Sequence, residues 1–386
     1  MTLISTWVRH DARSRQTVSP YRCEIARDYA TIEHRWRALA NRGVALAFQD
    51  EPWISTWYKT LGQLPGVEPL PLTIVDTLSG RDVMALPLVM RRSNGLRIIE
   101  AADGGMTDYN APIIGPDAPQ DMAGRRILLQ TILAQLPQAD ILRLTKMPLE
   151  VDARPNPLAF VPGTVPCRLT GNVLHMPERY EEWHWDLERT FRKELERSLR
   201  VFRRSPDAAF RRIEDPVEAA HVYGELKRLQ AERIRDLGLP YALGEPHNEA
   251  FYDQLVATGL QDGSVVLTAL LNGSEVVAAL LGIRSGKHYA MVRLGVAGGH
   301  WKICSPGRLV IERTMQHLHG LGLRSFDFTI GDYDYKRRLG VTPLPLVDFS
   351  RALSWRGIVP VALERLRAFA RTNPLIQRLR QRLAAI

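Results

Sequence analysis

The sequence lacks the features that mark several common protein classes. Its 386 residues include only three cysteines, Cys23, Cys167 and Cys304, and these lie far apart. Such scattered cysteines predict reduced thiols in a cytoplasmic protein rather than a disulfide framework or a zinc site. No apolar run reaches the roughly 18 residues of a membrane-spanning helix. The opening MTLISTWVRHDARSRQ also lacks the apolar core of a secretory signal.

Nucleotide and metal motifs are missing as well. No GxxxxGK[ST] loop occurs, and no GxGxxG follows an expected strand, so nucleotide hydrolysis and dinucleotide redox chemistry have no support. The ten histidines show no HExxH spacing, and His317 and His319 would face different ways on a helix. We therefore expect no metal.

What is present is a positive charge concentrated in two segments. The net charge is +9; residues 188–212 hold nine basic and four acidic residues, and residues 351–386 hold eight arginines and one glutamate. These segments suit a polyanionic ligand, nucleic acid or an anionic membrane, but solvated helix faces would look the same.

Arg197 and Arg200 would share one helix face, which could bind an acidic acceptor or the 3′-phosphate of coenzyme A, or simply face water. The arginine-rich tail could lie on the inner membrane surface or pack its apolar stripe on the protein.

The order of expected elements divides the chain into two α/β units with mixed sheets. Each half reads as helices, a hairpin, a strand, a helix and a strand. The first hairpin would turn at TLSG, and Asn272-Gly273 gives the strongest hairpin signal for the second. In the second half, helices are expected at 181–204, 217–237 and 248–259. The Pro- and Gly-rich stretch 147–166 looks like the crossing between the halves. We expect a loose tail at 1–19, domains at 20–165 and 166–345, and a strand with a basic helical tail at 346–386.

The stretch SPGRLVIERT predicts an anion site at a helix start. Ser305 is a favoured N-cap residue, Pro306 suits the first helical position, and Gly307 leaves the backbone open to approach. Free N–H groups and the helix dipole there would attract a phosphate, and Arg308 adds a charge. A plainly capped helix is the alternative.

The order of hairpin, strand, SPGRLV helix and FDFTIGDYDYK resembles the GNAT-superfamily acyltransferases. It resembles more closely their CelD-like branch of cellulose and exopolysaccharide biosynthesis, which is similar to the FemABX peptidoglycan aminoacyltransferases in having two tandem GNAT-like domains. The stretches FQDEPWISTWYKTLG, LPLVMRR, GMTDYNAPIIG and FRKELERSLRVFRR also fit. The resemblance covers roughly residues 45–340.

The resemblance implies a donor site for acetyl-CoA or a longer acyl-CoA. In this superfamily the third and last strands of such a unit splay apart, so Leu294 of the third strand would line the pantetheine arm. The pyrophosphate would rest on Ser305, Pro306, Gly307 and Arg308. The superfamily's fuller acyl-CoA loop is absent, because only Gly307 of its glycines remains. An acid or tyrosine is also expected in the span GVAGGHWKIC and is missing.

The ionisable residues after the last strand would then lie beside the thioester. Asp332 or Asp334 could accept the proton of an attacking amine, and Tyr335 could protonate the departing thiolate. Lys336 could offset negative charge or hold an acidic substrate group. Each also has a structural alternative, since Tyr335 could be a packed aromatic residue and Lys336 a surface charge.

The acceptor would bind between the halves. Asp108, Tyr109 and Asn110 form a polar group between apolar runs, and Asp108 could hold an amine or a sugar hydroxyl; a turn is the alternative. Asp327 would point away from Phe326 and Phe328 and could bind substrate or fix a neighbouring loop.

Three functions follow from these observations. The first is an acyl-CoA-dependent N- or O-acyltransferase acting on a small or lipid-linked precursor of a polysaccharide. The second is a Fem-like transferase that uses aminoacyl-tRNA, with residues 188–212 on the RNA. The third is a non-catalytic scaffold in polysaccharide synthesis, favoured by the incomplete acyl-CoA loop.

Overall fold

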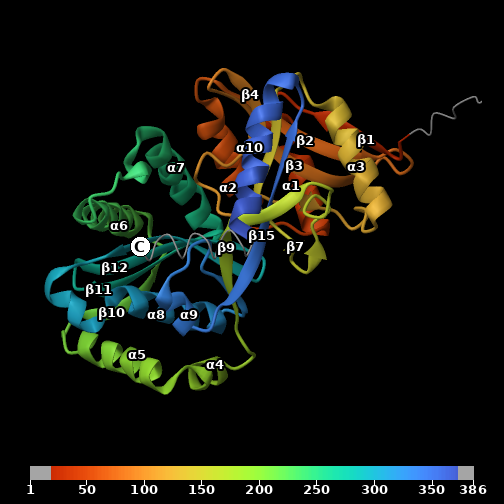
Figure 1. Ribbon diagram of the computed structural model, residues 1–386. Coiled ribbons are helices and arrows are strands. Elements are labelled where there is room, and N and C mark those ends of the chain that lie inside the picture. The colour runs from red at the N-terminus through yellow and green to blue at the C-terminus, as the bar shows by residue number, and fades with distance from the viewer. Residues whose placement is uncertain (1–18, 373–386) are drawn as a thin grey trace, which may run out of the picture.

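The structure, a computed structural model, describes residues 19–372 and shows a mixed α/β fold of two similar halves (Figure 1). Each half has a sheet with helices on both faces. The two sheets join edge to edge into one sheet of thirteen strands, in the order β1-β2-β3-β4-β6-β15-β9-β14-β13-β12-β11-β10, with β5 paired to β3. The predicted fold class, two tandem units with mixed sheets, is confirmed. The predicted loose tail lies outside the described residues, except Ser19.

The first half contains most of the elements expected from its sequence. The hairpin predicted around TLSG is formed by β2 and β3, which pair antiparallel. Its elements are β1 (Tyr21–Ile25), α1 (Glu33–Arg42), α2 (Trp53–Lys59), β2 (Val67–Asp76), β3 (Asp82–Ser93), β4 (Leu96–Ala101), β5 (Ile113–Ile114), α3 (Met122–Gln135), β6 (Ile141–Pro148), β7 (Glu150–Val151) and β8 (Arg154–Pro155), with one-turn 3-10 helices at Tyr29–Thr31 and Leu61–Gln63.

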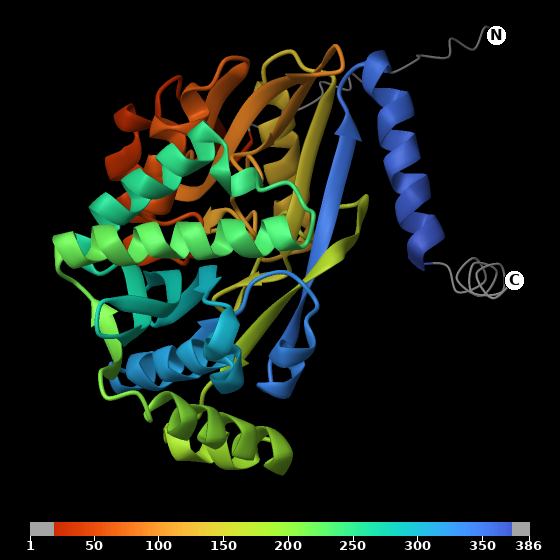
Figure 2. The same cartoon turned by 90° about the vertical axis from the view of Figure 1, so that its left-hand side faces the viewer.

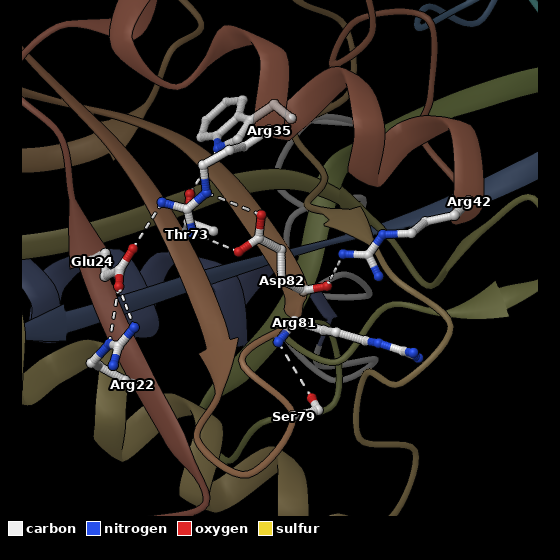
Figure 3. Close-up of polar contacts among 9 residues, drawn as sticks. Arg22, Glu24, Arg35, Arg42, Thr73, Ser79, Arg81 and Asp82 are labelled. Atoms are coloured by element: carbon white, nitrogen blue, oxygen red, sulfur yellow. Dashed lines mark hydrogen bonds and ion pairs between the residues drawn. The ribbon is translucent and has the colours of Figure 1, made fainter.

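Polar contacts fix α1 on the sheet of the first half. Arg35 of α1 bonds Glu24 of β1 and Asp82 of β3 (Figure 3). Beside it, the indole N–H of Trp36 donates to Thr73 of β2 at 2.8 Å. Because Trp36 is fully buried, this hydrogen bond satisfies a donor that water cannot reach.

The second half repeats the arrangement around another hairpin. Asn272-Gly273 forms the predicted turn, with Gly273 at a positive φ of 59°. The elements are β9 (Thr164–His175), α4 (Tyr180–Asp186), α5 (Arg189–Phe202), β10 (Ala208–Ile213), α6 (Pro216–Asp236), a 3-10 turn (Ala242–Gly244), α7 (Pro246–Asp262), β11 (Val265–Asn272), β12 (Glu275–Ser285), β13 (His288–Val296), a 3-10 helix η4 (Gly299–Cys304), α8 (Pro306–Gly320), β14 (Ser325–Asp327), α9 (Asp334–Arg338), β15 (Thr342–Ala352) and α10 (Trp355–Thr372).

Strand β15 links the sheets of the two halves. Strand β15 comes at the end of the chain but pairs with β6 of the first half, whereas β9 precedes the second half and pairs with β14. The two strands also pair with each other, antiparallel, and so close the sheet between the halves (Figures 1 and 2). The first half therefore depends on a strand from a distant part of the sequence.

Several local predictions were wrong. The helix predicted at 181–204 is broken after Asp186 into α4 and α5. The twelve-residue strand β9, which begins at Thr164 near the end of the Pro- and Gly-rich stretch, was not predicted. The last strand of the second half stops at Asp327, and the residues after it form the short helix α9, where no helix was predicted. No helix within residues 19–372 combines the length and apolar character needed to cross a bilayer.

Candidate functional site

The site is formed where two parallel strands of the second half separate. Strand β13 pairs with β14 only over His288–Ala290 and Ser325–Asp327, although β13 continues to Val296. A cavity of about 550 Å³ lies beyond this point. Leu294 and Val296 of β13, Ser305–Arg308 at the start of α8 and Tyr335 of α9 all line it. The fold thus gathers the residues predicted for the donor site around one cavity.

The start of α8 leaves hydrogen-bond donors unused. Pro306 is the first helical residue, as predicted, but Ser305 makes no side-chain cap and has a left-handed backbone, with φ 45°. Its hydroxyl instead accepts from the Arg308 guanidinium at 2.9 Å. No acceptor among residues 19–372 faces the N–H groups of Gly307 and Arg308. These donors and the helix dipole make the rim of the cavity suited to an anion.

Gly307 keeps this rim close to the sheet. A Cβ atom at Gly307 would lie 3.2 Å from a methyl group of Val296, so a larger residue would push helix and strand apart or fill the cavity. The Arg308 guanidinium is held by Glu194 of α5, whose carboxylate accepts hydrogen bonds from both Arg308 and Arg338. These hydrogen bonds lower the pKa of Glu194. Arg308 therefore reaches the cavity with part of its charge already paired.

The opposite wall of the cavity was missed by the sequence analysis. Leu229, Glu232, Arg233 and Asp236 of α6 line it, and Lys302 of η4 adds a cation near the start of α8. Residues of α6 were predicted to be helical, but nothing in their spacing indicates which face meets the cavity. Their place in the cavity wall becomes clear only from the tertiary structure, in which α6 packs against β13.

Tyr335 of α9 also lines the cavity. Burial raises its pKa to about 12, and nearby Tyr333 contributes to the shift. The phenol is therefore protonated at neutral pH and can donate a hydrogen bond. Among the predicted catalytic residues, Tyr335 is the one that lines the cavity.

The other two predicted catalytic residues lie elsewhere. The Lys336 ammonium is buried and donates to the backbone carbonyls of Phe328, Thr329 and Ile330, at 2.7, 3.2 and 2.8 Å. Burial lowers its pKa to about 8. Lys336 thus fixes the loop after β14. The Asp332 side chain is 81% exposed, forms an ion pair with Arg337, and is not among the residues that line the cavity.

The predicted acceptor residues meet at the boundary between the halves. The Tyr109 hydroxyl donates to Asp327 at 2.9 Å, and the Thr329 N–H donates to the same carboxylate oxygen at 2.6 Å. Burial raises the pKa of Asp327 to about 7 and also raises that of Asp108. Asp327 lines a second cavity of about 430 Å³ between the halves. By contrast, Asn110 is buried and its amide bonds Asp103 and the Thr145 carbonyl, within the first half.

A buried guanidinium lies on the α6 side of β13. A β-bulge at this part of the strand turns Arg293 toward α6, on the same face as Leu281, its partner in β12. Arg293 is 1% exposed and donates to Gln230, Tyr223 and Tyr241, with no carboxylate in contact among the described residues. It connects β13, α6 and the segment leading to α7. No sequence signal marked it.

The equivalent place in the first half holds a smaller cavity, of about 400 Å³, with a different lining. Strands β4 and β6 also pair over only three residues, but Asn110 bonds the backbone of Thr145 and Lys146 there. At the start of α3, the Asp121 carboxylate accepts from the Gly124 N–H at 2.6 Å. A carboxylate already occupies this helix start and would repel a phosphate. The geometry therefore favours a donor site in the second half only.

The basic helix α5 lies outside both cavities. Arg197 and Arg200 are exposed and have no carboxylate partner within residues 19–372, and neither lines the donor cavity. Within the same residues, no group of three or more His, Cys, Asp or Glu side chains is arranged to hold a metal ion.

Comparison with known proteins agrees with this geometry. A family model described as an acetyltransferase (GNAT) domain matches residues 189–337, which include α5 to α9. A search of curated protein sequences finds no match to this chain. Among solved structures, FemX is similar, with a TM-score of 0.55 at 12% identity over 82% of this chain and 95% of FemX. A C-terminal domain from Agrobacterium fabrum, described as part of a lysylphosphatidylglycerol synthetase, gives a TM-score of 0.50 at 12% identity over 89% and 97% of the two chains. At this identity the two structures support the fold, and the matched domain supports a transferase.

Proposed function

We propose that this protein transfers an acyl group from an acyl-CoA to an amine or hydroxyl of a polar acceptor, with the donor bound in the cavity beside α8. The observation that carries the proposal is the combination of separated strands with a helix start whose N–H groups are free, inside the segment that matches a GNAT domain. The N–H groups of Gly307 and Arg308 would hold the pyrophosphate, and Lys302 would add a cation.

The edge of β13 supplies the next part of the site. Beyond Ala290 the strand has no β14 partner, so backbone groups near Leu294 are free to bond the amides of a pantetheine arm. Leu294, Val296 and Ile311 give this passage apolar walls. An extended donor would then point its thioester toward α9, which carries Tyr335.

The chemistry proposed for this site is direct transfer. The nucleophile bonds to the thioester carbon, the C–S bond breaks, and the electron pair leaves on sulfur. Tyr335, protonated at neutral pH, would donate to that sulfur as its charge develops. The nucleophile's proton would pass to Glu232 or Asp236, the carboxylates that line the cavity, which replace the exposed Asp332 in this role. The acceptor would enter from the boundary between the halves, near Asp108, Tyr109 and Asp327.

Donor binding and turnover test this function separately. Calorimetry with acetyl-CoA and longer acyl-CoAs should show binding to the wild type and at least tenfold weaker binding to Gly307→Glu, because a carboxylate would occupy the phosphate position. The matched control is Gly320→Glu, at the far end of α8, where added atoms meet nothing. Unchanged affinity in Gly307→Glu would exclude this donor site.

Tyr335→Phe removes only the phenol oxygen. We expect the rate of acyl transfer, measured by the release of free thiol, to fall about 100-fold, at the lower end of the range typical for general acid catalysis, with donor affinity almost unchanged. Wild-type turnover in Tyr335→Phe would remove this residue from the reaction.

A second function is favoured by the exposed surface of α5. A transferase that uses aminoacyl-tRNA would need a basic surface for RNA, and Arg189, Lys193, Arg197 and Arg200 are exposed without ion pairs in the described chain. Binding of tRNA that weakens steeply with salt, and that is lost in Arg197→Gln/Arg200→Gln, would support it. If calorimetry shows binding of acyl-CoA and tRNA does not bind, the acyl-CoA-dependent function is supported instead.

A further inference from the structure

The last helix of the described chain has two apolar faces. On its inner face, Gly357, Val361 and Ala368 of α10 are buried against the protein. On the same side, the Glu364 carboxylate bonds Arg143 of β6 and the Ser350 hydroxyl of β15. These contacts fix the helix along β15, so its orientation is set by the fold.

The outer face carries large apolar side chains in water. Figure 2 shows α10 along one edge of the molecule, with no other described element on its outer side. With about 3.6 residues per turn, its exposed large apolar residues fall on one stripe opposite the buried face. They are Trp355 (80% exposed), Ile358 (57%), Val359 (65%), Leu363 (46%) and Leu366 (61%). A stripe this long is unusual for a surface that meets only water.

Arginines lie on both sides of this outer stripe. At 100° per residue, Arg365 falls on one flank and Arg356 and Arg367 fall on the other. Arg356 and Arg365 are anchored by hydrogen bonds to the carbonyls of Gly95 and Ser350. The only acid of α10, Glu364, is turned inward to Arg143. The outer surface is therefore apolar along its centre and cationic at its edges.

We propose that the outer face of α10 binds the surface of an anionic lipid bilayer, with the helix lying in the plane of the headgroups. An apolar stripe flanked by arginines matches acyl chains between anionic headgroups. A second copy of this chain fits less well, because pairing two such stripes would bring the flanking arginines of both helices together. The fixed inner face means that the whole protein would bind in one orientation.

Vesicle flotation with the full chain tests this proposal. The probes are vesicles of phosphatidylcholine alone and of phosphatidylcholine with 30% phosphatidylglycerol. We expect binding to the anionic vesicles and at least tenfold weaker binding to the neutral ones. Val359→Ser/Leu363→Ser/Leu366→Ser should lower the partition coefficient at least tenfold, because three large apolar side chains would no longer be buried among acyl chains. The matched control is Leu78→Ser/Val217→Ser, at residues that are 93% and 80% exposed on other elements.

Two further measurements separate lipid from other partners. Lipids with brominated acyl chains should quench fluorescence from Trp355, and the quenching should disappear in Trp355→Phe. Arg365→Gln/Arg367→Gln should weaken binding to anionic vesicles only, whereas Arg126→Gln, at an exposed site on α3, should not. Equal binding of the triple-serine variant, or a dimer in sedimentation equilibrium that this variant abolishes, would overturn the proposal.

Discussion

At the residue scale, the segment after β14 divides two roles between neighbouring side chains. Tyr335 faces the donor cavity, while Lys336 turns inward and holds three backbone carbonyls. Their sequence suggested a cluster of reactive groups, and composition alone could not say which of them pointed inward. Burial makes the difference, because a buried ammonium needs several acceptors and takes them from the loop that it closes.

Asp327 should make stability depend on pH. Its pKa is about 7 in the folded protein against about 3.9 in an unfolded chain, so folding favours the protonated form. The stabilisation that comes from the protonated Asp327 is fully present below about pH 4 and is lost as the pH rises through 7. As the pH rises from 5 to 8, we expect the free energy of unfolding of Asp327→Asn to increase by about 2–3 kcal/mol relative to that of the wild type. Urea denaturation at each pH would measure this difference. Asp332→Asn, at an exposed site, is the control. Parallel pH curves for Asp327→Asn and the wild type would contradict the raised pKa.

At the element scale, one β-bulge connects β13 to the helices that form the far wall of the cavity. It turns Arg293 toward α6, where the guanidinium holds Tyr241 of the segment before α7 and Gln230 of α6. Because Leu229 and Arg233 of α6 line the cavity, Arg293 positions that wall without touching the cavity itself. The bulge thus sets the geometry of the donor site from the opposite face of the strand.

Arg293→Met should loosen this arrangement. The change leaves two phenols and an amide without their donor, and we expect a loss of about 2–4 kcal/mol in free energy of unfolding. Amide hydrogen exchange in residues 237–245 should rise. Arg293→Lys should recover only part of the loss, because an ammonium lacks the planar fork of a guanidinium. Arg233→Met, at an exposed site on α6, serves as the control. Equal stability of Arg293→Met and this control would show that the fold does not need the buried charge.

At the scale of the whole molecule, strand β15 makes the halves interdependent, because it pairs with β6 of the first half and with β9 of the second. The continuous sheet and an apolar cluster that includes Trp53 of the first half and Phe251 of the second join them. Trp53 packs edge-on against Phe251 at 4.9 Å between ring centroids. We therefore expect the halves not to unfold as separate domains, although the repeated order of elements in the sequence predicts a domain boundary near residue 165.

A core substitution in β15 can test this coupling. Phe349 is 1% exposed and belongs to the core of the first half, although it lies near the end of the chain. We expect Phe349→Ala to lower the free energy of unfolding by about 3–5 kcal/mol. Amide exchange in β2 and in β12 should accelerate by the same factor, with one transition in urea. Leu78→Ala, at an exposed site, is the control, and faster exchange in β2 alone would show that the halves unfold independently.

The sequence by itself determined the local elements and the order in which they repeat. Turn residues at Asn272-Gly273, the helix start at Pro306 and the apolar periodicity of each half act over a few residues, so they can be read without knowing the fold. The predicted donor residues were found around one cavity for the same reason, since a strand end and the following helix start lie close in space.

Only the tertiary structure decided what depends on contacts between distant segments. These include the pairing of β15 with β6 of the first half, the cavity wall that α6 contributes, the hydrogen bond from Tyr109 to Asp327 across 218 residues, and the inward orientation of Lys336. No short-range pattern encodes them, because they arise when two halves bury apolar surface together and every enclosed polar group must find a partner. The sequence likewise indicated an amphipathic tail, but packing decided which face of α10 meets the protein and which remains outside.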